Sequence, residues 1–140
     1  MIEWAISPAS PHDLEELVSL WEICKLTRPW NDPRRDFHLA VDGETSAVLV
    51  LRDTAEISGS IMVGFDGHRG WVYYLAVHPD SQLRGAGRAL MTAAEDWLRA
   101  KSAPKIQLMV RYDNIAAQEF YAAIGYELQP VQTVGKRLDV

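Results

Sequence analysis

The segment QLRGAGR, residues 82–88, places two glycines and two arginines where a helix is predicted to begin. No Ser, Thr, Asp or Asn stands next to Gly85 to accept hydrogen bonds from the first backbone N–H groups of that helix. Arg84 and Arg88 are unfavourable beside the positive end of a helix dipole unless an anion binds there. Bare amides and guanidinium groups suit phosphate oxygens, so the segment indicates either an anion site or a flexible turn with solvated arginines.

Two common phosphate-binding patterns do not fit this segment. The Walker pattern ends in Gly-Lys followed by Ser or Thr, and GAGRAL, residues 85–90, contains no lysine. The dinucleotide pattern needs Gly or Ala where Leu90 stands, and an acidic residue at the end of the next strand, where the chain has Met109 and Val110. A nucleotide-phosphate enzyme is therefore a weak interpretation.

Two segments together resemble the GCN5-related N-acetyltransferase (GNAT) superfamily. Gln82–Gly87 matches its Gln/Arg-x-x-Gly-x-Gly/Ala signature, and LAVHP, residues 75–79, matches the end of its fourth strand. NIAAQEFYAAIGY, residues 114–126, supplies a second family element, in which a helix-starting Asn precedes an aromatic-Tyr pair and a Gly-aromatic pair. The resemblance covers most of the chain in element order and is specific in these segments.

The resemblance implies an α/β fold with a mixed sheet, the acyl-CoA N-acyltransferase fold. Its central sheet is mostly antiparallel, with a splayed parallel pair of strands and about four helices. We expect one N-acetyltransferase domain over residues 1–140. In the family, coenzyme A lies where the fourth and fifth strands separate, so acetyl-CoA is the expected co-substrate.

The resemblance also implies which residues would bind acetyl-CoA. Backbone groups at the end of the fourth strand would pair with pantetheine, the amides of the glycine-containing turn would hold the pyrophosphate, and the helix after residue 113 would contribute two side chains. These cofactor-binding residues are Leu75, Ala76, Val77, Leu83, Arg84, Gly85, Ala86, Gly87, Arg88, Asn114 and Tyr121.

Tyr121 is the candidate general acid. It follows Asn114 by two helical turns, so both side chains share one face about 10 Å apart along the helix axis. If Asn114 touches pantetheine, the Tyr121 phenol can lie near the thioester sulfur and donate a hydrogen bond to the departing thiolate. The alternatives are that Asn114 only caps the helix and that Tyr121 only packs as an aromatic side chain.

The general base is less clear from the sequence. Many family members carry a glutamate late in the fourth strand, whereas this chain has Tyr73 and Tyr74 there. Asp66 and His68, in the preceding turn, are the candidate bases, each acting through a water molecule. The alternative for both is a solvated turn, because Asp and Gly are common turn residues.

The acceptor site is expected beside the loop LTRPWNDPRRD, residues 26–36, where the family's first two helices often form a wall. Trp30 and Tyr73 are the candidate substrate-binding residues. Arg28, Arg34 and Arg35 could attract a carboxylate of the acceptor. The alternatives are that Trp30 anchors the loop in the core and that the arginines are solvated.

Hydrophobic periodicity and cap residues predict the elements that would position these side chains. Ser10 is a helix N-cap with Pro11 and Asp13 following it, and Asp32 caps a second helix that begins at Pro33. Later helices follow Gly85 and either Asp113 or Asn114, the last one ending at Gly125. The expected strands are residues 2–6, 47–53, 56–67, 70–77, 105–110, 126–130 and 134–139.

Composition narrows the cellular setting and the partners. The chain has 140 residues and a formal net charge of −5, which argues against nucleic acid or a membrane surface as partner. Cys24 is the one cysteine and no signal peptide is evident, so we expect the cytoplasm. The four histidines show no ligand spacing, so no metal is expected. Five tryptophans and an edge strand permit a homodimer without requiring one.

The function predicted in this way is direct transfer of an acetyl group from acetyl-CoA to a primary amine, on a small molecule or a peptide. The alternative is an inactive acyl-CoA-binding sensor or interaction module. The missing glutamate supports the alternative. The presence of Tyr121 argues against it, because binding alone does not require that phenol.

Overall fold

The computed structural model describes residues 4–139 and divides the chain into two compact units, Met1–Met109 and Val110–Val140. The prediction of a single domain therefore stays a prediction. The elements in chain order are β1 (Ala5–Pro8), the 3₁₀ turn η1 (Pro11–Asp13), α1 (Leu14–Ile23), α2 (Pro33–Asp42), β2 (Ser46–Asp53), β3 (Glu56–Phe65), β4 (Gly70–Val77), the 3₁₀ turn η2 (Pro79–Ser81), α3 (Ala86–Ala100), β5 (Ile106–Leu108) and α4 (Ile115–Ala123).

The first unit is built on one mixed sheet with the strand order β1-β2-β3-β4-β5. The first four strands are antiparallel to their neighbours, whereas β5 runs parallel to β4. β5 pairs with Gly70–Val72 alone, so the remainder of β4, to Val77, has no β5 partner. The predicted mixed α/β fold with a splayed parallel pair is confirmed.

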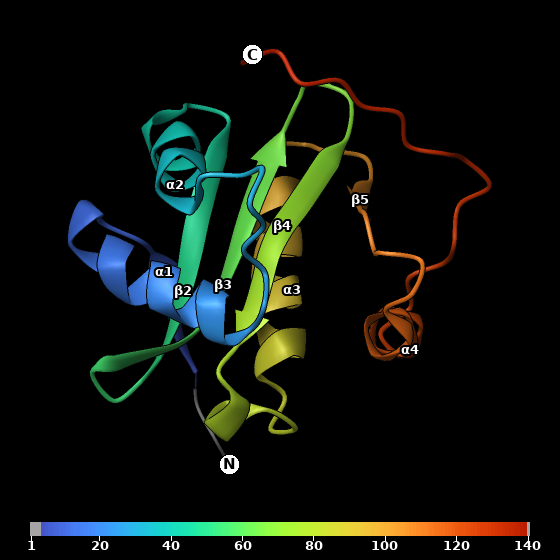
Figure 1. The fold of residues 1–140 in the computed structure, drawn as a ribbon. Coiled ribbons are helices and arrows are strands. Elements are labelled where there is room, and N and C mark those ends of the chain that lie inside the picture. Colours follow the sequence, from blue (N-terminus) through green and yellow to red (C-terminus); the bar gives the residue numbers. More distant parts are fainter. Residues whose placement is uncertain (1–3, 140) are drawn as a thin grey trace. The chain divides into compact units, whose positions relative to one another are not determined.

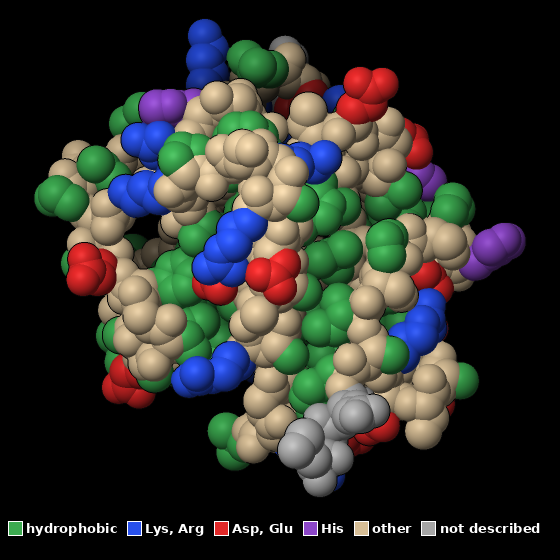
Figure 2. Space-filling model, turned by 180° about the vertical axis from the view of Figure 1, so that it is seen from behind, with side chains coloured by type: hydrophobic (Ala, Val, Ile, Leu, Met, Phe, Trp, Pro, Cys, Tyr) green, Lys and Arg blue, Asp and Glu red, His purple; other side chains and the backbone are tan. Residues whose placement is uncertain are grey.

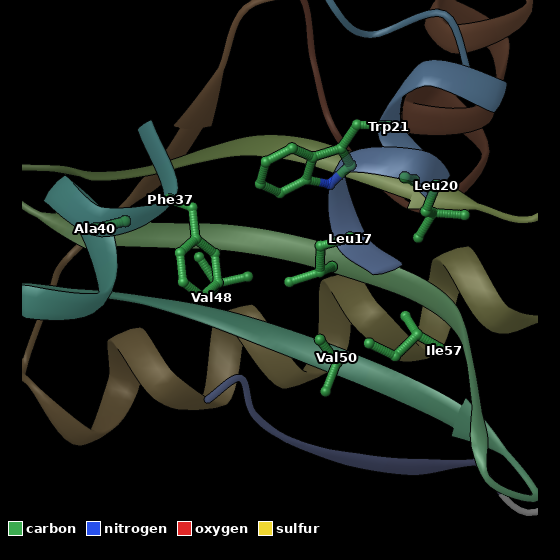
Figure 3. Packing of buried hydrophobic residues seen from close by; sticks show 9 residues of the cluster. Leu17, Leu20, Trp21, Phe37, Ala40, Val48, Val50 and Ile57 are labelled. Carbon is green, nitrogen blue, oxygen red and sulfur yellow. The ribbon is translucent and has the colours of Figure 1, made fainter. Parts of the chain in front are cut away.

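Helices cover both faces of this sheet (Figure 1). On one face, α1 and α2 contribute Leu17, Trp21 and Phe37 to a buried cluster that also contains Val48 and Val50 of β2 (Figure 3). Because side chains alternate along a strand, Leu49, between these two valines, points to the opposite face, which α3 covers. The sheet is therefore the middle layer of three, and its central strands β2 and β3 are buried on both sides.

Three helix starts carry the caps that the sequence predicts. The Asp13 carboxylate accepts a hydrogen bond from the Ser10 backbone N–H at 2.9 Å, as in a capping box. The Asp32 side chain accepts from the amides of residues 34 and 35, and the Asn114 side chain accepts from the amide of Ala117. In contrast, α3 begins after Gly85 with no side-chain cap.

Some of the predicted strands are absent, shortened or shifted. The structure has no strand at residues 126–130 or 134–139 within the part of the chain that it describes. Pro130 lacks the backbone N–H that a strand ladder needs, and the described residues of this region stay in irregular backbone. The predicted strand 105–110 is shortened to Ile106–Leu108, and the expected first strand is shifted to Ala5–Pro8; residues 2 and 3 lie outside the described residues.

Charged side chains of both signs are scattered among apolar ones on the face seen in Figure 2, with no single basic patch there. Within residues 4–139, no helix is long and apolar enough to cross a membrane. In the same range, no group of three or more His, Cys, Asp or Glu side chains is arranged to hold a metal ion.

Gly70 allows α3 to pack closely against the start of β4. A Cβ atom at this position would lie 2.6 Å from Leu98 Cδ2 and 3.0 Å from Leu98 Cγ, and the Leu98 side chain is buried. We predict that Gly70→Ala lowers the free energy of unfolding by about 1–3 kcal/mol through overpacking, measured by urea denaturation. Gly135→Ala is the control, since a Cβ there meets nothing within 4 Å. Equal stability of the two variants would contradict this packing argument.

Candidate functional site

The turn before α3 exposes a row of backbone amides. Leu83 and Gly85 both have positive φ angles, 64° and 86°, which turn the chain sharply into the helix. Among the residues that the structure describes, no protein acceptor is found for the amides of residues 83–88. A helix start without acceptors is able to bind an anion, because its orphan N–H groups carry partial positive charge.

The two arginines of this turn add positive charge to it. Arg84 and Arg88 are exposed, and neither forms an ion pair with another residue in the described part of the chain. They therefore stay beside the positive end of the α3 dipole without a protein carboxylate to neutralise them. The turn is a local positive site on a chain whose net charge is −5.

A β-bulge marks the part of β4 that has separated from β5. Met62 pairs with Tyr73 and Ser60 pairs with Ala76, so two residues of β4 stand opposite one residue of β3. Tyr74 lies in this bulge with a φ of 52°, an unusual conformation for a residue that is not glycine. Such backbone persists only where the surrounding contacts hold it.

Three contacts hold Tyr74 in place. Its ring stacks on Trp21 with 4.1 Å between ring centroids, and its carbonyl oxygen accepts a hydrogen bond from Ser60 Oγ at 3.0 Å. Its hydroxyl donates to Asp36 Oδ2 at 2.6 Å. Partial burial and the hydrogen bond to Asp36 raise the pKa of Tyr74 well above its usual range, so the phenol stays neutral. Tyr74 thus connects α1, α2 and β3 to the bulge.

The carbonyl oxygen of Val77, at the end of β4, is already engaged. It accepts hydrogen bonds from Gln82 Nε2 at 3.2 Å and from Cys24 Sγ at 3.3 Å. The carbonyl therefore has protein donors, so an expected pantetheine contact at this residue would have to use its N–H or displace them. Burial raises the pKa of the Cys24 thiol, which makes it a poor nucleophile.

A cavity of about 590 Å³ opens on the α2 face of the sheet. It reaches the point where β4 and β5 separate, because Val72, Tyr73 and Met109 line it. Asp36 is the one acidic residue among its described lining residues. The full lining is Leu26, Asn31, Asp36, Leu39, Ala40, Ser46, Met62, Val63, Gly64, Val72, Tyr73, Tyr74 and Met109.

Of the two residues predicted to bind the acceptor, Tyr73 and Trp30, one lies in the cavity wall and the other does not. Tyr73 lines the cavity, whereas Trp30 is 57% exposed and is not among the lining residues. Arg28 donates to the carbonyls of Lys25 and Thr27, and Arg34 pairs with Glu15 at 2.7 Å. Asp36 and Asn31 also line the cavity and were not predicted from the sequence. Asp36 lies in the first turn of α2, and Asn31 directly precedes the cap residue Asp32.

Asp66 and His68 lie in the turn between β3 and β4. Asp66 Oδ1 accepts from the backbone N–H groups of His68 and Arg69, and its Oδ2 accepts from Trp71 Nε1 at 3.2 Å. These hydrogen bonds, chiefly those from the backbone, lower the pKa of Asp66. Asp66 is therefore a weak base that organises the turn, and the assignment of a base to either residue stays a prediction.

The second unit contains the other two predicted residues, Asn114 and Tyr121. Asn114 Oδ1 accepts from the Ala117 amide at 3.1 Å, so Asn114 is the helix cap that the sequence predicts. The Tyr121 ring makes edge contacts with Phe120 and Tyr126. Burial raises the pKa of Tyr121 to about 12. The phenol is thus protonated at any physiological pH, as a proton donor must be.

Comparison with known proteins gives one consistent result. The family model described as "Acetyltransferase (GNAT) family" matches residues 13–126. A curated relative, Acetyltransferase SG1711 from Sodalis glossinidius (strain morsitans), is 48% identical over 127 residues, which cover 90% of this chain and 89% of that protein.

Solved structures show the same fold at low sequence identity. AAC(6')-Iy, in complex with the bisubstrate analogue CoA-S-monomethyl-acetylneamine, has a TM-score of 0.83 at 16% identity, and the match covers 97% of this chain and 99% of that one. The ribosomal-protein-S18-alanine N-acetyltransferase from Escherichia coli has a TM-score of 0.75 at 24% identity, with 88% and 77% covered. The two structures carry names of very different acceptors, so fold similarity does not identify an acceptor.

The hydrogen bond between Tyr74 and Asp36 should contribute to stability. We predict that Tyr74→Phe lowers the free energy of unfolding by about 1–2 kcal/mol, because a hydrogen bond to a carboxylate is lost in a partly buried place. Tyr73→Phe is the matched control. The Tyr73 side chain is next in sequence and 44% exposed, so this substitution should change the free energy of unfolding by less than about 0.5 kcal/mol. Chemical denaturation of both variants measures the difference. Two equally stable variants would show that the bond has no net effect.

Proposed function

Because the chain belongs to the acetyltransferase (GNAT) family, we propose that it is an N-acetyltransferase that uses acetyl-CoA and a primary amine. The acceptor is a small molecule or a peptide amine. Transfer is direct, with no acyl group held on the protein, because the one cysteine is half-buried and hydrogen-bonded to a carbonyl. The net reaction converts acetyl-CoA and an ammonium ion to the N-acetyl amine, free CoA thiol and one proton.

One observation carries this proposal: the amides of residues 83–88 have no acceptor within the described chain. A pyrophosphate would supply acceptor oxygens for these amides, and Arg84 and Arg88 would supply two positive charges beside them. Gly85, with its positive φ, and Gly87 leave no side chain over the turn. The turn therefore fits the diphosphate part of coenzyme A.

The separated part of β4 fits the pantetheine arm. Since β5 stops pairing at Val72, backbone groups of Leu75, Ala76 and Val77 on that side have no strand beside them. An extended ligand with amide groups can occupy such an edge as an added strand. The engaged carbonyl of Val77 limits this contact to its N–H and to groups nearer the bulge.

In this proposal, side chains of the protein take part in the transfer of two protons, both of which leave the acceptor nitrogen. The acceptor enters as an ammonium ion and loses one proton before its nitrogen can attack; Asp66 or His68 would take that proton through water. As the C–N bond forms and the C–S bond breaks, the amine nitrogen loses a second proton and the thiolate gains one. In this proposal Tyr121 donates to the leaving sulfur and Asn114 helps to hold the arm. The hydrogen bonds that lower the pKa of Asp66 make His68 the better of the two bases.

An acyl-CoA-binding sensor is the second candidate, and the occupied carboxylate of Asp66 favours it, because three hydrogen bonds make Asp66 a weak base. Incubation with acetyl-CoA and a library of amines separates the two functions through the release of free thiol. Amine-dependent thiol release supports the enzyme. Tight acetyl-CoA binding without release for any amine would support the sensor.

The turn before α3 yields a binding prediction. Gly87→Val puts a branched side chain where the pyrophosphate would lie, so the Kd for acetyl-CoA should rise about tenfold or more, which is about 1.4 kcal/mol. Ala100→Val, at the exposed end of the same helix and about 20 Å away, is the control. Calorimetric titration with acetyl-CoA measures the affinity of both variants. Unchanged affinity in the Gly87 variant would contradict the anion site.

Tyr121 yields a kinetic prediction. Tyr121→Phe should lower kcat by about 10²-fold with little change in the KM for acetyl-CoA, because the variant loses the proton-donating hydroxyl and keeps the ring that would contact the cofactor. Since burial raises the pKa of Tyr121 to about 12, its ionisation should produce no loss of wild-type activity below about pH 11. Tyr112→Phe, with an 88% exposed ring, is the control. A Tyr121 variant with wild-type turnover would remove the phenol from the mechanism.

A further inference from the structure

We propose that the cavity on the α2 face binds an acceptor amine with one positive charge on an apolar body, and that Asp36 is the charge partner. This inference rests on the proposed acetyltransferase function and names the class of its acceptor. The expected substrates are alkylamines and arylalkylamines that have a single amino group. Polyamines, aminoglycosides and free amino acids should be poorer acceptors.

The charge partner is held in one orientation. Tyr74 donates its hydroxyl to Asp36 Oδ2 at 2.6 Å, and Tyr74 is itself fixed by Trp21 and Ser60. Within the described chain, Asp36 Oδ1 receives no hydrogen bond. One oxygen of the carboxylate is thus available to a ligand, at a fixed place on the cavity wall.

No positive side chain competes for this carboxylate within the cavity. The described lining residues include no Lys, Arg or His. Arg28, Arg34 and Arg35 are the arginines predicted to attract a carboxylate of the acceptor. The guanidinium groups of Arg28 and Arg34 are bound to backbone carbonyls and to Glu15, respectively, and Arg35 is not among the lining residues. A cationic ligand therefore finds a partner here, and an anionic one does not.

Neighbouring carboxylates give the cavity a negative field. Burial comes first among the causes that raise the pKa of Tyr73 and of Tyr74, and nearby carboxylates add to it. Asp66 acts on Tyr73, and Asp36 and Asp32 act on Tyr74. Each phenol of the cavity thus has at least one carboxylate near it. This field would attract an ammonium ion and repel the carboxylate of an amino acid.

The rest of the cavity wall is mostly apolar and therefore favours a ligand whose uncharged part is apolar. Seven of the described lining side chains are aliphatic or thioether groups: Leu26, Leu39, Ala40, Met62, Val63, Val72 and Met109. A ligand that buries methylene groups against them should gain about fourfold in affinity for each one. With a single carboxylate in the lining, the second and third charges of a polyamine or an aminoglycoside would stay unpaired.

The first experiment measures binding alone, apart from turnover. N,N-dimethyl-2-phenylethylamine is cationic and apolar but has no N–H for acetylation, and 2-phenylethanol is its neutral counterpart. NMR titration of the wild-type chain should show the amine binding more tightly than the alcohol. Asp36→Asn should weaken amine binding about tenfold and leave alcohol binding unchanged. Asp80→Asn, at a carboxylate whose side chain is 91% exposed, is the matched control.

The second experiment measures acceptor choice. The kcat/KM for 2-phenylethylamine should exceed that for ethylamine, phenylalanine and spermidine, each by about tenfold or more. Asp36→Asn should raise the KM for 2-phenylethylamine without changing the KM for acetyl-CoA. Leu39→Ser, at a side chain that is 66% exposed and thus not needed for folding, should lower kcat/KM for 2-phenylethylamine but not for ethylamine.

The outcomes separate this inference from the proposed function. Amine binding that does not depend on Asp36, or a preference for phenylalanine or spermidine, would overturn the assignment of the acceptor class. If the wild-type chain binds no acetyl-CoA and releases no thiol with any amine, the proposed function fails, even where the dimethylated amine binds through Asp36.

Discussion

The site depends on one constraint, which is that β4 and β5 are hydrogen-bonded for only three residues and then separate. Past Val72, one edge of β4 lacks a strand partner, although β4 is an inner strand of the five-stranded sheet. Unpaired backbone groups inside a fold need a partner. In this protein the candidate anion turn, the bulge and the cavity all lie at or beyond this separation.

Tyr74 is the residue that keeps this open region in shape. Its positive φ is tolerated because Trp21, Ser60 and Asp36 each bind a different part of it, the ring, the carbonyl and the hydroxyl. The same contacts join the two helices on one face of the sheet to the bulge. The strained backbone of Tyr74 and the contacts that hold it thus lie where the cavity meets the part of β4 that has separated from β5.

The first unit has two local sites of opposite charge. The turn at residues 83–88 presents backbone N–H groups and two guanidinium groups, whereas the cavity presents the carboxylate of Asp36. A reaction between an anionic thioester cofactor and a cationic amine needs this division, because each partner would be repelled from the other's site. The net charge of −5 alone does not indicate these two local sites of opposite charge.

The sequence alone determined what depends on neighbours along the chain. Helix caps at Ser10, Asp32 and Asn114, the strand that ends at Val77, and the uncapped turn before α3 follow from short-range hydrogen-bonding and periodicity, and all were predictable. The resemblance to the GNAT superfamily came from two such short segments. Only the tertiary structure decided what depends on distant contacts. It brought Asp36 to Tyr74 across 38 positions of sequence, and it left Trp30 outside the cavity. It also left residues 126–139 without the strands that their alternation predicts, because a strand needs a partner that no local pattern can supply.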